Sequence, residues 1–179
     1  MEVKKKGLII VHTGNGKGKT TASLGIAFRA IGHNHRVIMI QFIKSSRGGW
    51  HYGEIETAKR LLPNIEIYPM GEGFTWKTRD RDRDIRKVEE AWKFSKKQII
   101  DNKHQIVILD EINYAIKLGY LSIKETIKFL KKKPSELHIV LTGRDAHPEL
   151  IEIADIVTEM IEIKHPYKEG ISAQKGIEF

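Results

Sequence analysis

The fold is decided by residues 8–21, which read LIIVHTGNGKGKTT. A short apolar run, Leu8–His12, passes directly into a loop that holds three glycines and two lysines, and helical spacing follows over Lys19–Ile31. A buried strand, a glycine-rich loop and a helix in this order are the context that a phosphate-binding loop requires. The stretch therefore predicts an α/β fold whose first strand ends at an anion-binding loop.

The rest of the chain alternates apolar runs of strand length with amphipathic segments of helix length. Further strands are expected at Val37–Phe42, Ile65–Tyr68, Ile106–Leu109, Leu137–Thr142 and Ile156–Ile163. Further helices are expected at Glu54–Leu62 and Asp80–Asn102, after the capping box that begins at Ser122, and from Pro148 to Ala154. This alternation predicts one domain, residues 1–179, with a mostly parallel central sheet and helices on both of its faces.

Composition excludes several classes of protein. The 179 residues carry 31 Lys and Arg against 23 Asp and Glu, a net charge of +8, and they include no cysteine. Disulfides, iron–sulfur clusters and a thiol nucleophile are therefore excluded, and no apolar run is long enough to span a membrane. We expect a cytoplasmic protein with anionic partners such as nucleotides. Because the basic residues are not interleaved with aromatic ones, we expect no specific nucleic-acid partner. The lack of a long apolar run leads us to expect no membrane partner.

Each residue type in the phosphate loop suits the binding of a nucleotide. Glycines let the backbone turn its N–H groups inward, and the start of the following helix adds partial positive charge at the same place. Lys19 can reach phosphate oxygens, and the Thr20 hydroxyl can ligate Mg²⁺. Thr13 stands where the general pattern has a glycine, so this loop is a variant. The expected nucleotide-binding residues are Thr13, Gly14, Asn15, Gly16, Lys17, Gly18, Lys19, Thr20 and Thr21.

Charged residues also follow two later strands, at the sheet edge where ligands bind in open α/β folds. Asp110 and Glu111 come directly after one strand and could hold Mg²⁺, either directly or through water. The alternative for Asp110 is that it caps the following helix. Arg144 follows another strand and could clamp a polyphosphate, although a plain surface arginine would fit the sequence as well.

With these residues assembled, the chain resembles the P-loop type of ATP:cob(I)alamin adenosyltransferases, also called ATP:corrinoid adenosyltransferases. The similarity runs from Gly7 to the end of the sequence. The motifs that carry it are TGNGKGKTT at 13–21, QFIK at 41–44, GFTW at 73–76, LDE at 109–111, TGR at 142–144 and KGIEF at 175–179. The loop motif is shared with many nucleotide-binding proteins, whereas its ordered combination with GFTW is much more specific.

The resemblance implies a RecA-like P-loop fold, usually as a homodimer, and a reaction. Such enzymes transfer the 5′-deoxyadenosyl group of ATP to Co(I) of a corrinoid, either cobalamin or cob(I)yrinic acid a,c-diamide, in adenosylcobalamin biosynthesis or salvage. The reduced cobalt is the nucleophile and tripolyphosphate leaves, so no protein base is needed. Lys19, Arg144 and Mg²⁺ would stabilise the leaving group, and the nucleotide would lie reversed relative to ordinary P-loop enzymes. A reductase or a flavodoxin-like protein is a candidate electron donor.

The resemblance also gives Phe74 and Trp76 a role. They match residues that lie under the corrin ring and displace the lower axial ligand of cobalt, which makes Co(II) easier to reduce. The alternative is that both are ordinary hydrophobic anchors of a loop. Two departures affect this region: Lys77 stands where an acidic residue is expected, and only Met1–Lys6 precede Gly7, where many members have an N-terminal arm. We therefore expect the lid that this arm forms over a neighbouring site to be missing or replaced.

Three other functions remain open from the sequence. A small P-loop kinase or ATPase would release ADP or phosphate, but it needs an acceptor site or a water-orienting group. A non-catalytic module that holds ATP or a corrinoid would bind without turnover. A RecA-like nucleic-acid ATPase would be motivated only by the charge of +8.

Overall fold

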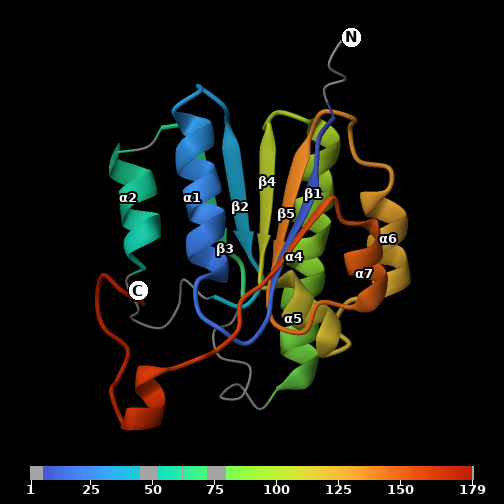
Figure 1. Ribbon diagram of the computed structural model, residues 1–179. Helices are drawn as coiled ribbons and strands as arrows, with labels where there is room; N and C mark the ends of the chain where they lie inside the picture. The colour runs from blue at the N-terminus through green and yellow to red at the C-terminus, as the bar shows by residue number, and fades with distance from the viewer. Residues whose placement is uncertain (1–5, 45–51, 62, 72–79, 179) are drawn as a thin grey trace.

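Six parallel strands form one central sheet in the computed structural model, which describes residues 6–44, 52–61, 63–71 and 80–178. The strand order is β3-β2-β4-β5-β1-β6, and every pair of neighbours is parallel (Figure 1). The strands are β1 Ile9–Thr13, β2 Val37–Gln41, β3 Ile65–Pro69, β4 Ile106–Asp110, β5 His138–Thr142 and β6 Ile156–Glu159. Because β5 lies between β1 and β4, the phosphate loop after β1 and the acidic residues at the end of β4 are two strands apart.

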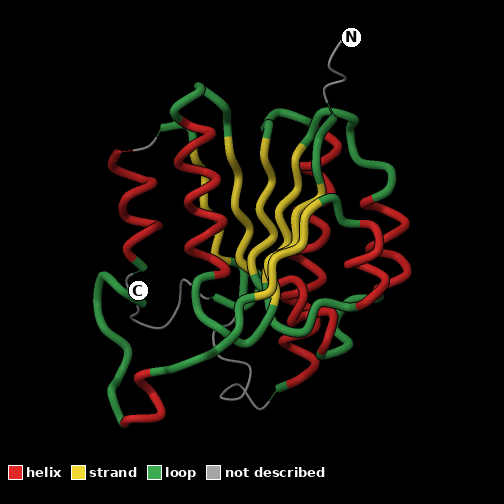
Figure 2. Tube along the Cα trace, viewed as in Figure 1, coloured by secondary structure: helices red, strands yellow, loops and turns green. Residues whose placement is uncertain are grey.

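Helices cover both faces of this sheet (Figure 2). On one face lie α1 and α2, and on the other lie α4, α5, α6 and α7 (Figure 1). Their bounds are α1 Lys19–Ile31, α2 Gly53–Leu61, α4 Arg81–Asp101, α5 Ile112–Lys117, α6 Ile123–Leu130 and α7 Pro148–Ile153, and a 3₁₀ helix, η1, spans Pro166–Glu169. Ser122 caps α6 by accepting a hydrogen bond from the Glu125 N–H, as the capping box predicts.

Successive residues of the strands pack into two separate cores. Ile38, Ile40 and Leu109 pack toward the α4 side, together with Trp92. Their neighbours Met39 and Ile108 pack toward α1 and α2 in the second core. Because strand side chains alternate between faces, a sheet that is covered on both sides needs continuous apolar strands. The central strands of this chain have that composition.

The predicted fold class is confirmed: the protein has an α/β fold with a parallel central sheet, helices on both faces and the P-loop arrangement of strand, glycine-rich loop and helix at its start. Two predictions need correction. β6 ends at Glu159 rather than at Ile163, and it is an exposed edge strand. Helix α5 was not expected, because six residues are too few to show helical periodicity. None of the helices in the described parts is both long enough and apolar enough to cross a membrane.

Parallel strands place all their carboxyl ends at one edge of the sheet. The phosphate loop after β1, Gln41 at the end of β2, Asp110 at the end of β4 and Thr142 at the end of β5 therefore come together. This edge is where open α/β sheets bind their ligands.

Candidate active site

The phosphate loop turns sharply at two glycines and encloses the side chain of Lys19. Gly14 and Gly18 have φ values of 92° and 109°, a region that residues with a side chain rarely adopt. The Lys19 Nζ atom donates hydrogen bonds to the carbonyl oxygens of Gly14, at 2.8 Å, and Gly16, at 2.7 Å. Burial lowers the pKa of Lys19, and the nearby Arg144 charge acts in the same direction. The loop thus holds a cation at its centre.

Gly16 serves a different purpose from the one that the sequence suggested. Its N–H donates to the carbonyl oxygen of Met160 at 2.6 Å, so this amide does not point into an anion nest. The Met160 N–H in turn donates to the carbonyl oxygen of Thr13 at 2.9 Å. A Cβ atom on Gly16 would lie 2.8 Å from backbone atoms of Met160 and Ile161. Glycine is required here because the chain that follows β6 crosses the loop in direct contact.

Replacing Gly16 with alanine should therefore destabilise the protein. The new methyl group would meet backbone that cannot give way, and overpacking of this kind costs about 1–3 kcal/mol. Gly25→Ala is a matched control, because Gly25 is exposed within α1 and its Cβ would have no described atom within 4 Å. That change should be neutral or stabilise by up to about 1 kcal/mol. Thermal unfolding of both variants measures the difference, and equal stabilities would contradict the account.

Asp110 is fully buried at the end of β4 and accepts hydrogen bonds from three elements. Its Oδ1 atom accepts from the hydroxyls of Thr20, at 2.9 Å, and Thr142, at 2.8 Å, and its Oδ2 atom accepts from the Gln41 amide at 3.3 Å. The predicted alternative, that Asp110 caps the next helix, is wrong, because Glu111 occupies the cap position of α5. The hydroxyl of Thr20 and the carboxylate of Asp110 are hard oxygen donors, which fit the preference of Mg²⁺.

Glu111 has an unusual backbone and an unusual acidity. Its φ of 64° is uncommon for a residue other than glycine, a type of strain that concentrates at functional sites. Burial, together with the adjacent charge of Asp110, raises the pKa of Glu111 to about 7. The Glu111 N–H donates to the Thr142 hydroxyl at 2.9 Å. Thr142 therefore positions both acidic residues, a role that sequence reasoning missed because it depends on β5 lying beside β4.

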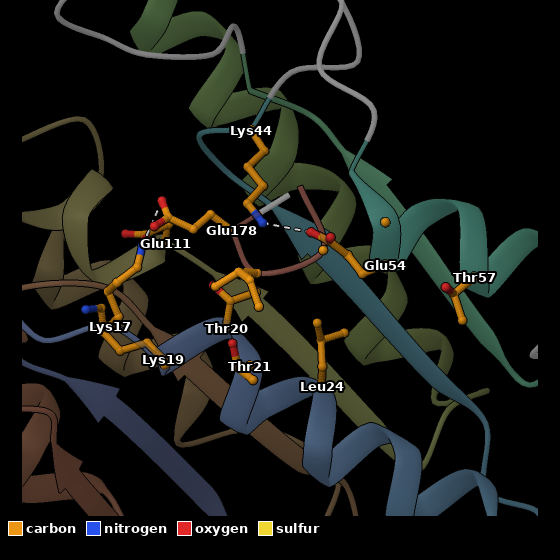
Figure 3. Close-up of a pocket in the computed structure, with 14 residues that line it drawn as sticks. Lys17, Lys19, Thr20, Thr21, Leu24, Lys44, Glu54, Thr57, Glu111 and Glu178 are labelled. Atoms are coloured by element: carbon orange, nitrogen blue, oxygen red, sulfur yellow. Dashed lines mark hydrogen bonds and ion pairs between the residues drawn. The ribbon is translucent and has the colours of Figure 1, made fainter. Parts of the chain in front are cut away.

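A cavity of about 600 Å³ opens between the phosphate loop, α1 and α2 (Figure 3). Its lining includes Lys17, Gly18, Lys19, Thr20, Thr21, Leu24, Lys44, Gly53, Glu54, Thr57, Glu111, Gly176, Ile177 and Glu178. This volume lies in the range of small-molecule sites, and the loop contributes two cations, Lys17 and Lys19, to the lining. Six of the lining residues come from the predicted set: Lys17, Gly18, Lys19, Thr20, Thr21 and Glu111.

Lys44 and Glu54 form a charged pair at the cavity that the sequence did not predict as functional. The Lys44 Nζ atom lies 2.8 Å from Glu54 Oε1. Burial alone would lower the pKa of Lys44, but the carboxylates of Asp110 and Glu54 outweigh it and raise that pKa. Burial would raise the pKa of Glu54, but the charge and hydrogen bond of Lys44 outweigh it and lower that pKa, so both groups are charged at neutral pH. The QFIK motif indicated similarity at Lys44, but its partner on α2 becomes visible only in three dimensions.

The family model described as ATP:corrinoid adenosyltransferase BtuR/CobO/CobP matches residues 5–179. The chain belongs to this family. It is similar to a corrinoid adenosyltransferase of Sinorhizobium sp., with 49% identity over 177 residues, 98% of this chain and 81% of the relative. It is also similar to the corrinoid adenosyltransferase of Pseudomonas aeruginosa, with 45% identity over 98% of this chain and 85% of the relative. The corrinoid adenosyltransferase of Escherichia coli K12 is 40% identical over 98% of this chain and 87% of the relative. A KaiC-like protein of Pyrococcus horikoshii is a distant structural neighbour, with 18% identity, a TM-score of 0.45, and coverage of 86% of this chain and 73% of that one.

The remaining residues that the sequence predicts for the site of this family member lie in different positions. The Thr13 hydroxyl accepts from the Ala146 N–H at 3.0 Å and so faces the loop after β5. Asn15 is exposed. Arg144 is exposed and does not line the cavity, yet its charge adds to the lowering of the pKa of Lys19. At Glu111 the same charge partly offsets the rise in pKa that burial causes. Phe74 and Trp76 lie outside the described residues, so their predicted role stays a prediction.

Proposed function

We propose that this protein transfers the 5′-deoxyadenosyl group of ATP to the Co(I) centre of a corrinoid and releases tripolyphosphate. The acceptor is cobalamin or cob(I)yrinic acid a,c-diamide, in adenosylcobalamin biosynthesis or salvage. One observation carries the proposal: within the family match over residues 5–179, residues of four quoted motifs line one cavity large enough for a nucleotide, namely 17–21, Lys44, Glu111 and 176–178. The cavity presents Lys17, Lys19 and the start of α1 to a triphosphate group.

The reaction needs positioning and charge stabilisation more than acid–base chemistry. Co(I) donates an electron pair to C5′ of the ribose, the bond from C5′ to its phosphate oxygen breaks, and that bonding pair leaves with tripolyphosphate. Cobalt becomes Co(III), bonded to carbon. Because the nucleophile is cobalt, the protein need not remove a proton from it. Lys19 supports the leaving group from the centre of the loop, and preorganised charge of this kind is a large contribution to catalysis.

We assign the predicted metal role to Thr20 and Asp110, with Glu111 beside them. Their oxygen atoms already converge, since the Thr20 hydroxyl lies 2.9 Å from Asp110 Oδ1. Magnesium, when bound, would neutralise part of the triphosphate charge. Thr142 and Gln41 orient the Asp110 carboxylate toward this position, and supporting hydrogen bonds of this kind tune metal sites. Arg144 remains a candidate clamp for the departing triphosphate.

Trp76→Ala should distinguish the reduction of Co(II) to Co(I) from the alkylation of Co(I). If Trp76 and Phe74 displace the axial ligand, the variant should lose about tenfold or more of the rate when the reaction starts from Co(II) with a reductant. It should keep most of the rate with cobalt that has been reduced chemically to Co(I). Trp76→Phe, which retains an aromatic wall, should fall between the two. Equal Co(II)-dependent rates for wild type and Trp76→Ala would remove the axial role and favour simple packing.

Three further features follow from the resemblance. We propose a homodimer, a reductase or flavodoxin-like electron donor, and a cytoplasmic location. Size-exclusion chromatography with light scattering would measure the first, and a reconstituted Co(II) assay with flavodoxin would measure the second.

An anaerobic assay tests the proposed function. Purified protein is mixed with chemically reduced cob(I)alamin, ATP and Mg²⁺, and the absorbance of the cobalt–carbon product is followed with time. We expect adenosylcobalamin to form only when protein and ATP are both present. Steady release of ADP and phosphate without alkylation would favour the kinase or ATPase alternative, and binding without turnover would favour the non-catalytic module.

A further inference from the structure

A carboxylate from the far end of the chain reaches the phosphate loop. After β6 the backbone crosses the loop at Met160, continues through η1 and returns beside α2 (Figure 1). There Gly176–Glu178 line the same cavity as the loop. We call residues 161–178 the tail. The reaction described above gives the tail no role.

The tail turns one side chain into the cavity. Glu178 Oε2 lies 3.0 Å from the Nζ atom of Lys17, and the two side chains point toward each other (Figure 3). The Glu178 side chain is only 18% exposed, whereas its neighbour Ile177 is 78% exposed. An apolar residue thus faces solvent while a carboxylate faces the phosphate loop, the reverse of what the hydrophobic effect alone would produce. The ion pair explains this orientation.

Little else holds the end of the tail in place. None of residues 161–178 is buried. The N–H groups of Ile177 and Glu178 both donate to the Gln174 carbonyl oxygen, at 3.2 and 2.9 Å, which is a local turn. Gly176 has a φ of 80° and no described atom near its Cβ position. Segments with few buried contacts open at low free-energy cost, so the carboxylate can leave Lys17 without unfolding the domain.

A triphosphate group and Glu178 compete for the same cation. Both are anions, and their mutual repulsion is strong in a partly enclosed cavity. Lys17 is the residue of the loop that already has a carboxylate partner, whereas Lys19 is held by backbone carbonyl groups. Bound polyphosphate would therefore replace Glu178 at Lys17.

We propose that Glu178 is an internal counter-ion of Lys17 that the triphosphate group displaces on binding, and whose return helps to expel tripolyphosphate. The role in product release rests on the proposed function, whereas displacement by a polyphosphate does not. The tail thereby sets how tightly the loop holds its most highly charged ligand.

Calorimetric binding of inorganic tripolyphosphate tests this inference without any corrinoid. We expect Glu178→Gln to bind about two- to fivefold more tightly than wild type at low ionic strength, because the competing charge is gone. The difference should shrink in about 0.5 M salt, where exposed charges are screened. Glu169→Gln is the matched control, because it removes a carboxylate of the same tail that pairs with Lys164 at 3.0 Å, away from the loop. Its affinity should equal that of wild type.

A Lys17→Met protein and a proteolysis measurement show whether the effect of Glu178 depends on Lys17 and on release of the tail. In a Lys17→Met protein, Glu178→Gln should no longer change the affinity. Tripolyphosphate should also speed tryptic cleavage after Lys175 in the wild type, because the tail is released. Equal affinities for wild type and Glu178→Gln, or ligand-induced protection of Lys175 from trypsin, would overturn the role of Glu178 but leave the proposed function intact. If wild type and Lys19→Met both failed to bind tripolyphosphate, the proposed polyphosphate site itself would be wrong.

Discussion

Lys19→Met is expected to reduce kcat/KM for ATP by about 100- to 1,000-fold, the effect of removing one preorganised charge-stabilising group. The substitution keeps the aliphatic chain that fills the loop but removes the ammonium group that donates to the carbonyl oxygens of Gly14 and Gly16. Charge develops on the triphosphate as the bond to C5′ breaks, so kcat should fall more than KM rises. Steady-state rates with chemically reduced cob(I)alamin measure both constants.

A control variant must show that the loss of activity comes from the absence of Lys19 and not from the loss of any one positive charge. Lys93→Ala removes an exposed lysine from α4, on the other face of the sheet, and should leave both constants unchanged. Circular dichroism and thermal unfolding should show that Lys19→Met is folded. A folded Lys19→Met variant with nearly normal kcat would mean that the loop lysine does not stabilise the leaving group.

Asp110→Asn should have the second largest effect, a loss of about 100-fold at low magnesium concentration, because a buried anionic ligand is removed. The amide has the same shape, and its oxygen can still accept from Thr20 and Thr142. Its NH2 group can donate to Gln41 Oε1 once the Gln41 amide turns over, so the fold should survive. Activity as a function of Mg²⁺ concentration is the measurement, and the apparent metal affinity should fall at least as much as kcat.

Asp145→Asn provides the comparison for Asp110. Asp145 lies three residues beyond the end of β5, exposed and paired with Lys117 at 2.6 Å. Its loss should not alter the magnesium dependence. An Asp110→Asn protein with an unchanged magnesium profile would place the metal elsewhere and leave Asp110 as a structural residue.

The elements that were predictable are those with a local signal. The strand, loop and helix over residues 8–31 follow from an apolar run, three glycines and helical spacing, and the structure has them nearly where they were expected. The long helix α4 was expected because its periodicity extends over many turns. Helix α5 was missed because it is short and because Glu111, the cap residue before it, has a left-handed conformation.

The parts of the site that were missed depend on the tertiary arrangement of the chain. Thr142 contacts Asp110 because β5 is inserted beside β4. Glu178 pairs with Lys17, which lies 161 positions earlier in the sequence, and no local sequence pattern predicts such a pair. The role of Gly16 was misassigned for the same reason, because the chain that it touches returns only after β6. Sequence indicated the chemistry of the loop, while topology determined what surrounds it.

The central claim is that a P-loop site directs cobalt to the ribose carbon rather than directing an acceptor to phosphorus. A single-turnover reaction with ATP carrying ¹³C at C5′, excess protein and cob(I)alamin tests it most directly. We predict that the label appears in a carbon bonded to cobalt, with one tripolyphosphate released for each cobalt alkylated. Recovery of the label in ADP or AMP, with cobalt unmodified, would contradict the account.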